Sequence, residues 1–165
     1  MLFPTVLLLP LTCCDGGVDG TKPLLVDATV AFPPRDTVHA ALPAITHRCT
    51  DGRTILLEAV SPEGSGVLVR LHFRDSLRSG SYPVVVPGDT SAPGAVVAVR
   101  YVVGDVPRTV SLDSGTVELR RAGDRISGRI QGSGVQSAIR TPAWIRYSDV
   151  PLPAPSDTAS CAFQR

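Results

Sequence analysis

The residues in this chain that are best suited to chemistry are one Asp-Ser-Gly-Thr segment, three histidines and four cysteines. Asp113 opens that segment, and Ser114, Gly115 and Thr116 complete it. Two carboxylates held a few ångströms apart share one proton, because like charges so close do not both ionise, and such a pair activates water for hydrolysis. The sequence contains this segment once, so a pair of Asp113 carboxylates requires two copies of the chain.

The segment around Asp113 resembles the active-site signature of aspartic proteases, Asp-Ser/Thr-Gly flanked by apolar strand residues. The resemblance implies a hydrolase that works as a homodimer, with one Asp113 from each copy. Ser111 stands where that family prefers an apolar residue, and Val117 where it prefers a small or polar one. The alternative is a bulge in a strand, in which Asp113 caps backbone amides and Gly115 takes a positive φ. We favour the bulge and predict no catalytic residues.

The histidines offer one short ligand pair, His47-x-Cys49, of the kind that binds zinc or copper. No second pair of close ligands completes a tetrahedral site in the sequence, and a cysteine in an exported protein is more often oxidised. His39 lies in the same irregular stretch, and His72 is expected on a solvated strand face. The sequence also lacks a Gly-x-Ser-x-Gly nucleophile elbow and phosphate-binding glycine loops. It therefore predicts no metal, no cofactor and no enzymatic activity.

The first two cysteines follow an apolar run. Residues 2–11 read LFPTVLLLPL, which is too short for the roughly 20 apolar residues that cross a bilayer but typical of the core of a secretory signal. The run continues into Thr-Cys13-Cys14 and resembles a bacterial lipoprotein signal, in which a cysteine is lipidated and becomes the mature N-terminus. The resemblance implies that residues 1–13 are a signal peptide and that Cys14 carries the lipid, palmitate included. Lipidation of Cys13, an ordinary cleaved signal and a plain apolar N-terminal strand are the alternatives.

The remaining chain then divides into a tether and one domain. Residues 14–22 are rich in Gly and Asp, which resist packing, so we expect a flexible tether to a membrane of the bacterial cell envelope, facing the periplasm or the surface. Residues 23–165 are the domain. Its two cysteines, Cys49 and Cys161, are predicted to form a disulfide, because both parity and an exported location favour pairing. Their α-carbons should then lie within about 7 Å of each other. The alternative is a buried free Cys49 and a tail thiol that pairs with another protein.

Composition points to an all-β domain. The chain has 165 residues, of which 43% are hydrophobic, enough to bury one core. It contains 15 Gly and 15 Pro but only 5% aromatic residues, which is typical of short strands separated by turns. The formal net charge is +1 and the arginines are spread along the chain rather than clustered, so a nucleic-acid partner is not expected.

Alternation of apolar and polar residues places the strands. The predicted strands are about 24–32, 55–60, 67–74, 80–86, 95–103, 109–121, 125–131 and 143–150. Residues 35–48 have no clean period and are predicted to be an irregular loop. Seven to eight short antiparallel strands without helices predict a β-sandwich or a partly open barrel, of which we favour the sandwich.

The strand and glycine pattern over residues 54–150, with SGSYPV and SGTVELRRAGDRISGRI as its parts, resembles small β-sandwich domains of bacterial cell-envelope lipoproteins. That family implies no particular activity. We expect a membrane-anchored, non-catalytic binding or structural domain whose partner is an envelope protein or a glycan. A carbohydrate-binding module that stacks a sugar on Trp144 is an alternative, as is the Asp113 hydrolase. We favour a Trp144 that fills the end of the core.

Overall fold

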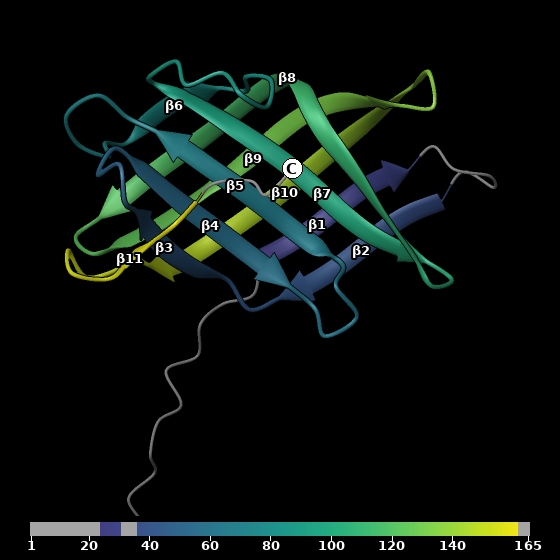
Figure 1. The fold of residues 1–165 in the computed structure, drawn as a ribbon, viewed down its shortest axis with the longest axis horizontal. Helices are drawn as coiled ribbons and strands as arrows, with labels where there is room; N and C mark the ends of the chain where they lie inside the picture. Colours follow the sequence, from purple (N-terminus) through teal and green to yellow (C-terminus); the bar gives the residue numbers. More distant parts are fainter. Residues whose placement is uncertain (1–23, 31–35, 162–165) are drawn as a thin grey trace, which may run out of the picture.

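The computed structural model describes residues 24–30 and 36–161, and every regular element in them is a β-strand (Figure 1). The strands are β1 (Leu24–Val30), β2 (Asp36–Leu42), β3 (Ile45–Cys49), β4 (Thr54–Val60), β5 (Gly66–His72), β6 (Gly80–Pro83), β7 (Gly94–Val103), β8 (Val106–Ala122), β9 (Arg125–Gln136), β10 (Ile139–Pro151) and β11 (Thr158–Ala159). In this part of the chain, no helix is long and apolar enough to span a bilayer. The predicted signal peptide, the two leading cysteines and the tether lie outside the described residues.

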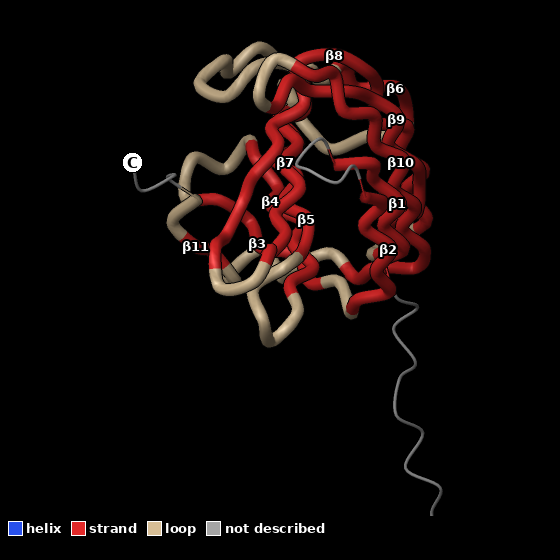
Figure 2. Tube along the Cα trace, turned by 90° about the vertical axis from the view of Figure 1, so that its right-hand side faces the viewer, coloured by secondary structure: helices blue, strands red, loops and turns tan. Residues whose placement is uncertain are grey.

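The strands form one sheet that folds over on itself. Their order is β11-β3-β4-β5-β7-β8-β9-β10-β1-β2, and β6 pairs with β8 beside this path. All neighbours are antiparallel except β11 and β3. Viewed end on, β3, β4, β5 and β7 form one layer, and β9, β10, β1 and β2 form the layer that faces it (Figure 2). The predicted all-β class, a sandwich or partly open barrel, is confirmed.

The long strand β8 joins the two layers. Up to Ser111 it pairs with β7, and from Leu112 onward it pairs with β9. Its later part also pairs with β6 on its other edge. The register shifts between Leu112 and Ser114, so a bulge marks the point where the strand passes from one layer to the other.

The structure differs from the sequence prediction over residues 35–48, where β2 and β3 replace the expected loop. In β3 an apolar side chain faces outward and a polar side chain faces inward, so the sequence lacks the apolar-polar alternation expected of a core strand. Ile45 is 51% exposed, whereas Thr46 is buried and donates its hydroxyl hydrogen bond to the backbone oxygen of Pro151. The other predicted strands are present with shifted ends, and the described residues contain eleven strands rather than seven to eight.

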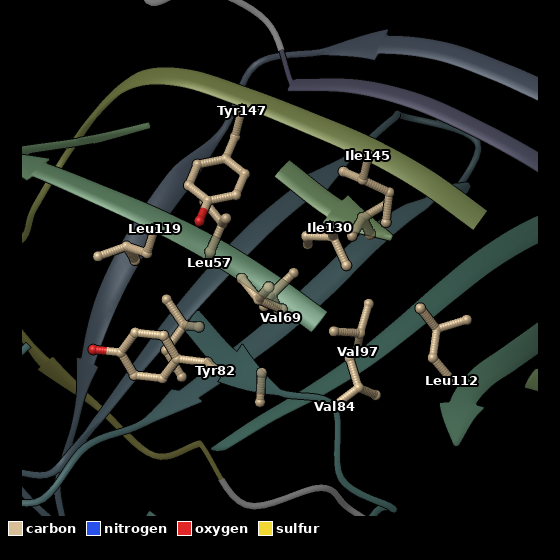
Figure 3. Packing of buried hydrophobic residues seen from close by; sticks show 14 of the residues in the cluster. Leu57, Val69, Tyr82, Val84, Val97, Leu112, Leu119, Ile130, Ile145 and Tyr147 are labelled. Atoms are coloured by element: carbon tan, nitrogen blue, oxygen red, sulfur yellow. The ribbon is translucent and has the colours of Figure 1, made fainter. Parts of the chain in front are cut away.

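The core lies between the layers (Figure 3). Leu57 and Val69 from one layer face Ile130 and Ile145 from the other, and all four are at most 1% exposed. The buried phenol of Tyr147 lies among them and donates a hydrogen bond of 2.9 Å to the backbone oxygen of Glu118. Burial raises the pKa of Tyr147, so its hydroxyl stays a donor. Contacts between residues distant in the chain thus hold the layers together.

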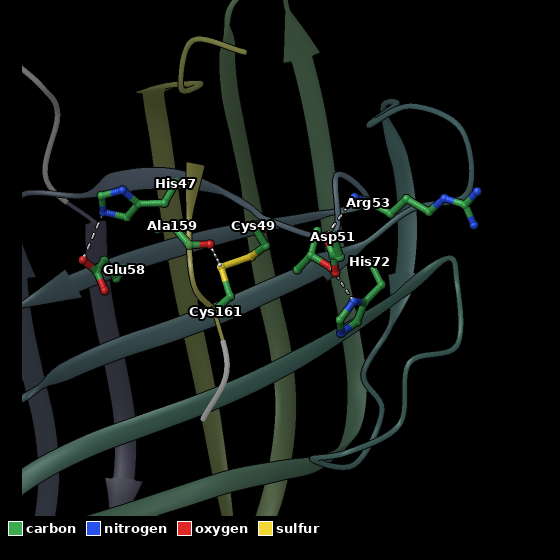
Figure 4. The surroundings of a disulfide bond; sticks show 9 residues. His47, Cys49, Asp51, Arg53, Glu58, His72, Ala159 and Cys161 are labelled. Atoms are coloured by element: carbon green, nitrogen blue, oxygen red, sulfur yellow. Dashed lines mark hydrogen bonds and ion pairs between the residues drawn. A yellow bond between two sulfur atoms is a disulfide. The ribbon is translucent and has the colours of Figure 1, made fainter. Parts of the chain in front are cut away.

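The C-terminal tail is fastened to the edge of β3. The strand β11 runs parallel to β3, and Cys161 is bonded to Cys49 across an α-carbon distance of 5.4 Å (Figure 4). Cys49 is 2% exposed. The amide of Thr50 also donates a hydrogen bond of 3.1 Å to the backbone oxygen of Ala159. The predicted disulfide is confirmed.

Candidate functional site

Trp144 lies on the outer face of β10, where it is 46% exposed. Its neighbours Ala143 and Ile145 are both buried, so the alternation of the strand directs the indole outward. The prediction that Trp144 fills the end of the core is therefore wrong. Tryptophan is prominent at binding surfaces because its large ring supplies contact area and aromatic interactions. The surface around it is the best candidate for a functional site in the described chain.

Polar side chains from three strands share the outer face with this indole. β8, β9 and β10 each contribute two residues that face outward at adjoining register positions. These six residues, named here the Trp144 face, are Thr116 and Glu118 on β8, Arg129 and Gln131 on β9, and Trp144 and Arg146 on β10. Trp144 is the register partner of Gln131, and Arg146 is the register partner of Arg129. All of them except Thr116 are exposed. The face thus combines one flat aromatic ring with amide, carboxylate and guanidinium groups.

A shallow hollow of about 690 Å³ opens beside Trp144. It is lined by every residue of the Trp144 face except Arg146, and also by Ser81, Ser114, Gly115, Gly132, Ser133 and Pro142. The hydroxyls of Ser114 and Ser133 lie 3.0 Å apart. Gly115 and Gly132 are register partners that add backbone but no side chain to the lining. The result is an open depression with an aromatic wall and many hydrogen-bonding groups.

Glu118 and Arg129 hold each other in place on this surface. Arg129 Nε lies 2.9 Å from Glu118 Oε2, and Arg129 Nη2 donates to Glu118 Oε1 at 3.0 Å. The hydrogen bond and the charge of Glu118 raise the pKa of Arg129, so its guanidinium stays charged. A two-pronged pair of this kind fixes the geometry of both side chains. It presents an acceptor and a donor side by side on the outer surface.

Asp113 lies in the bulge of β8 and is bound by Arg140. Arg140 Nη1 lies 2.6 Å from Asp113 Oδ1, and the same Nη1 donates to Ser133 Oγ at 2.9 Å. The predicted bulge is confirmed, and Gly115 takes a φ of 129°. The Asp113 carboxylate also forms an ion pair with Arg140, a partner that the sequence did not indicate. That pair lowers the pKa of Asp113 and keeps it charged, which opposes the proton sharing of an aspartic protease dyad.

A second polar cluster consists of Asp51, Thr54 and His72, which line one hollow together with the disulfide. Figure 4 shows Asp51 and His72 of this cluster near Cys49 and Cys161. The Thr54 hydroxyl donates to Asp51 Oδ2 at 2.6 Å and lies 2.9 Å from His72 Nδ1. Because the hydroxyl has one proton, it accepts from Nδ1, which fixes the tautomer of a neutral His72. Desolvation lowers the pKa of His72. The expected solvated position of His72 is therefore wrong, since the ring is partly buried within a hydrogen-bonded network.

The possible metal pair of His47 and Cys49 is not available. The sulfur of Cys49 is bonded to Cys161, and His47 Nε2 lies 3.4 Å from Glu58 Oε1 instead. Over residues 24–30 and 36–161, no three His, Cys, Asp or Glu side chains are grouped so as to hold a metal ion.

Sequence reasoning missed Glu118, Arg129 and Gln131 as site residues. A signal for them exists, because the two-residue turn Gly123-Asp124 pairs positions at equal distances before and after it. Ala122 and Arg125 flank that turn, and the same register places Glu118 opposite Arg129.

Comparison of the chain with protein-family models, with curated proteins and with solved structures finds no match. Cys14, the predicted lipidation site, lies outside the described residues. The exposed Trp144 face is therefore the basis of the proposed function.

Proposed function

We propose that this protein is a non-catalytic binding domain of the bacterial cell envelope, anchored through a lipid on Cys14, and that its Trp144 face binds a glycan. The single observation that supports glycan binding is the exposed indole of Trp144 beside an open, polar hollow. Sugars combine apolar ring faces with hydroxyls at the ring edge. The face offers a complementary surface for both.

The chemistry of the face fits a sugar in detail. The flat indole of Trp144 offers an apolar platform for stacking against a pyranose ring. Hydroxyl groups both donate and accept, so they need partners of both kinds. Gln131 supplies both, Glu118 accepts and Arg129 donates. Because Glu118 and Arg129 already hold each other, little side-chain ordering is needed when a ligand binds.

The chain provides its own reporter for this proposal, because Trp144 is the only tryptophan. Titration with soluble neutral and acidic oligosaccharides should change the emission of Trp144 in a saturable way for at least one of them. Trp144→Ala should weaken binding at least tenfold, about 1.4 kcal/mol, in calorimetry, which does not depend on fluorescence. Ile45→Ala is the matched control, since it also removes an exposed apolar side chain but lies on β3. Equal binding by the Trp144→Ala variant, or no binding of any glycan by the wild type, would contradict the proposal.

The anchor is tested separately in a bacterial host. The Cys14→Ser variant should move from the membrane fraction to the soluble fraction, because the acyl chains that hold the protein are lost. Cys13→Ser is the matched control and should remain with the membrane. Intact mass spectrometry should find a lipid-modified N-terminal cysteine on the wild type. A mature N-terminus without lipid would overturn the anchor and leave glycan binding untouched.

A further inference from the structure

We infer that the Trp144 face selects a glycan with a carboxylate, a uronic-acid sugar, and that Arg146 recognises the charge. This inference rests on the proposed glycan binding and adds the chemical class of the ligand. It follows from the distribution of charge around Trp144, which is uneven among the three strands.

The arginines near the indole differ in their partners. The charge of Arg129 is neutralised by Glu118, and that of Arg140 by Asp113. Among the side chains that the structure describes, Arg146 forms no ion pair. It is exposed on β10. Arg146 therefore supplies positive charge that an anionic ligand is free to use.

Arg146 lies opposite Arg129 in the sheet. The two are direct register partners on β10 and β9. Like charges at facing positions of an antiparallel pair destabilise a sheet. Glu118 offsets part of this repulsion through its ion pair with Arg129. No described carboxylate forms a corresponding ion pair with Arg146. An anion bound at Arg146 would reduce the remaining repulsion.

The spacing of Trp144 and Arg146 fits one acidic sugar. Residues two apart on a strand share a face, and their α-carbons are about 7 Å apart. That is the scale of a single pyranose ring with its substituent. A uronic acid stacked on Trp144 can thus direct its carboxylate toward Arg146. A guanidinium binds a planar carboxylate through two parallel hydrogen bonds, a geometry that Lys does not reproduce.

The test compares oligogalacturonate with its methyl ester, which keeps the rings and removes the charge. Calorimetry on the full-length protein should show the acid binding at least tenfold more tightly than the ester at low salt. Added NaCl should reduce this difference, because it screens an exposed charge pair. Arg146→Gln should bring acid and ester within about twofold of each other. Arg120→Gln is the matched control, since Arg120 is an exposed arginine on β8 and its loss changes the net charge equally.

The outcomes separate the two proposals. Equal binding of acid and ester by the wild type, or an Arg120→Gln effect as large as that of Arg146→Gln, would overturn the role of Arg146 while glycan binding stands. Binding of neutral oligosaccharides alone would reject the acidic class. If no acidic, esterified or neutral glycan binds, the proposed function itself fails. Circular dichroism of both variants should match the wild type, because both side chains are exposed.

Discussion

Loss of the Cys49–Cys161 bond is expected to lower the free energy of unfolding by about 4 to 5 kcal/mol at most. The bond joins residues separated by 112 positions, so it restricts a large loop of the unfolded chain, and the entropy removed by a crosslink grows with loop size. The change should appear as a lower urea midpoint for Cys49→Ala/Cys161→Ala, measured by circular dichroism. Trp144 emission is a poor probe of unfolding because the ring is already exposed in the folded protein.

The disulfide measurement needs two controls. A Cys13→Ser/Cys14→Ser background leaves only one bond that can form within the chain. Comparing its oxidised and reduced forms changes the bond but no side-chain volume, whereas the alanine variant also trims the buried Cys49. Equal midpoints for the oxidised and reduced protein would show that the bond contributes nothing beyond the pairing of β11 with β3.

Gly128→Ala is expected to destabilise the domain by about 3 kcal/mol, a large effect for the addition of one methyl group. Gly128 is the register partner of Tyr147 on β10. A Cβ at this position would collide with the backbone oxygen of Glu118 and with the Tyr147 hydroxyl, the two groups that are hydrogen-bonded to each other. The backbone oxygen has no flexible side chain to yield, so the strands must move apart. Urea unfolding should show this as a lower midpoint.

Two variants isolate the cause. Tyr147→Phe removes the hydroxyl and should cost only about 1 kcal/mol, the usual contribution of one hydrogen bond. Gln131→Ala shortens an exposed side chain on the same strand and should change stability by less than about 0.5 kcal/mol. A Gly128→Ala protein as stable as the Gln131→Ala protein would contradict the close packing of β8, β9 and β10 at Gly128.

The strands that sequence reasoning found are those whose inward positions are apolar. β4 and β5 alternate clearly, and both strands were predicted. β3 was not predicted, because a polar side chain can also be buried when its hydrogen bond is satisfied. Thr46 is buried with its hydroxyl satisfied by Pro151, while Ile45 faces outward. No propensity reveals such an inversion, because the partner oxygen comes from a strand distant in the chain.

The candidate site was predictable only in part for a similar reason. The turn at Gly123 fixes the pairing of Glu118 with Arg129, since glycine there adopts a positive φ of 64°. The next turn brings β10 alongside and contains Ser137 and Ala138, both with positive φ. These residues give no turn signal of the kind that glycine or asparagine gives. The register that places Trp144 beside Gln131 therefore became visible only in the structure.

The crossing of β8 from one layer to the other governs how the molecule opens. The strand hydrogen-bonds to β7 up to Ser111 and to β9 from Leu112. Without β8, β7 in one layer and β9 in the other would each lose a hydrogen-bonded neighbour. A fluctuation that frees one layer must also strain the other, which makes the two a single cooperative unit. We therefore expect amide protons at this junction to exchange with solvent only when the whole domain unfolds, which native-state hydrogen exchange would measure. Thr116 and Glu118 follow the junction on the same strand, so their part of the binding surface is preorganised by the stability of the entire domain.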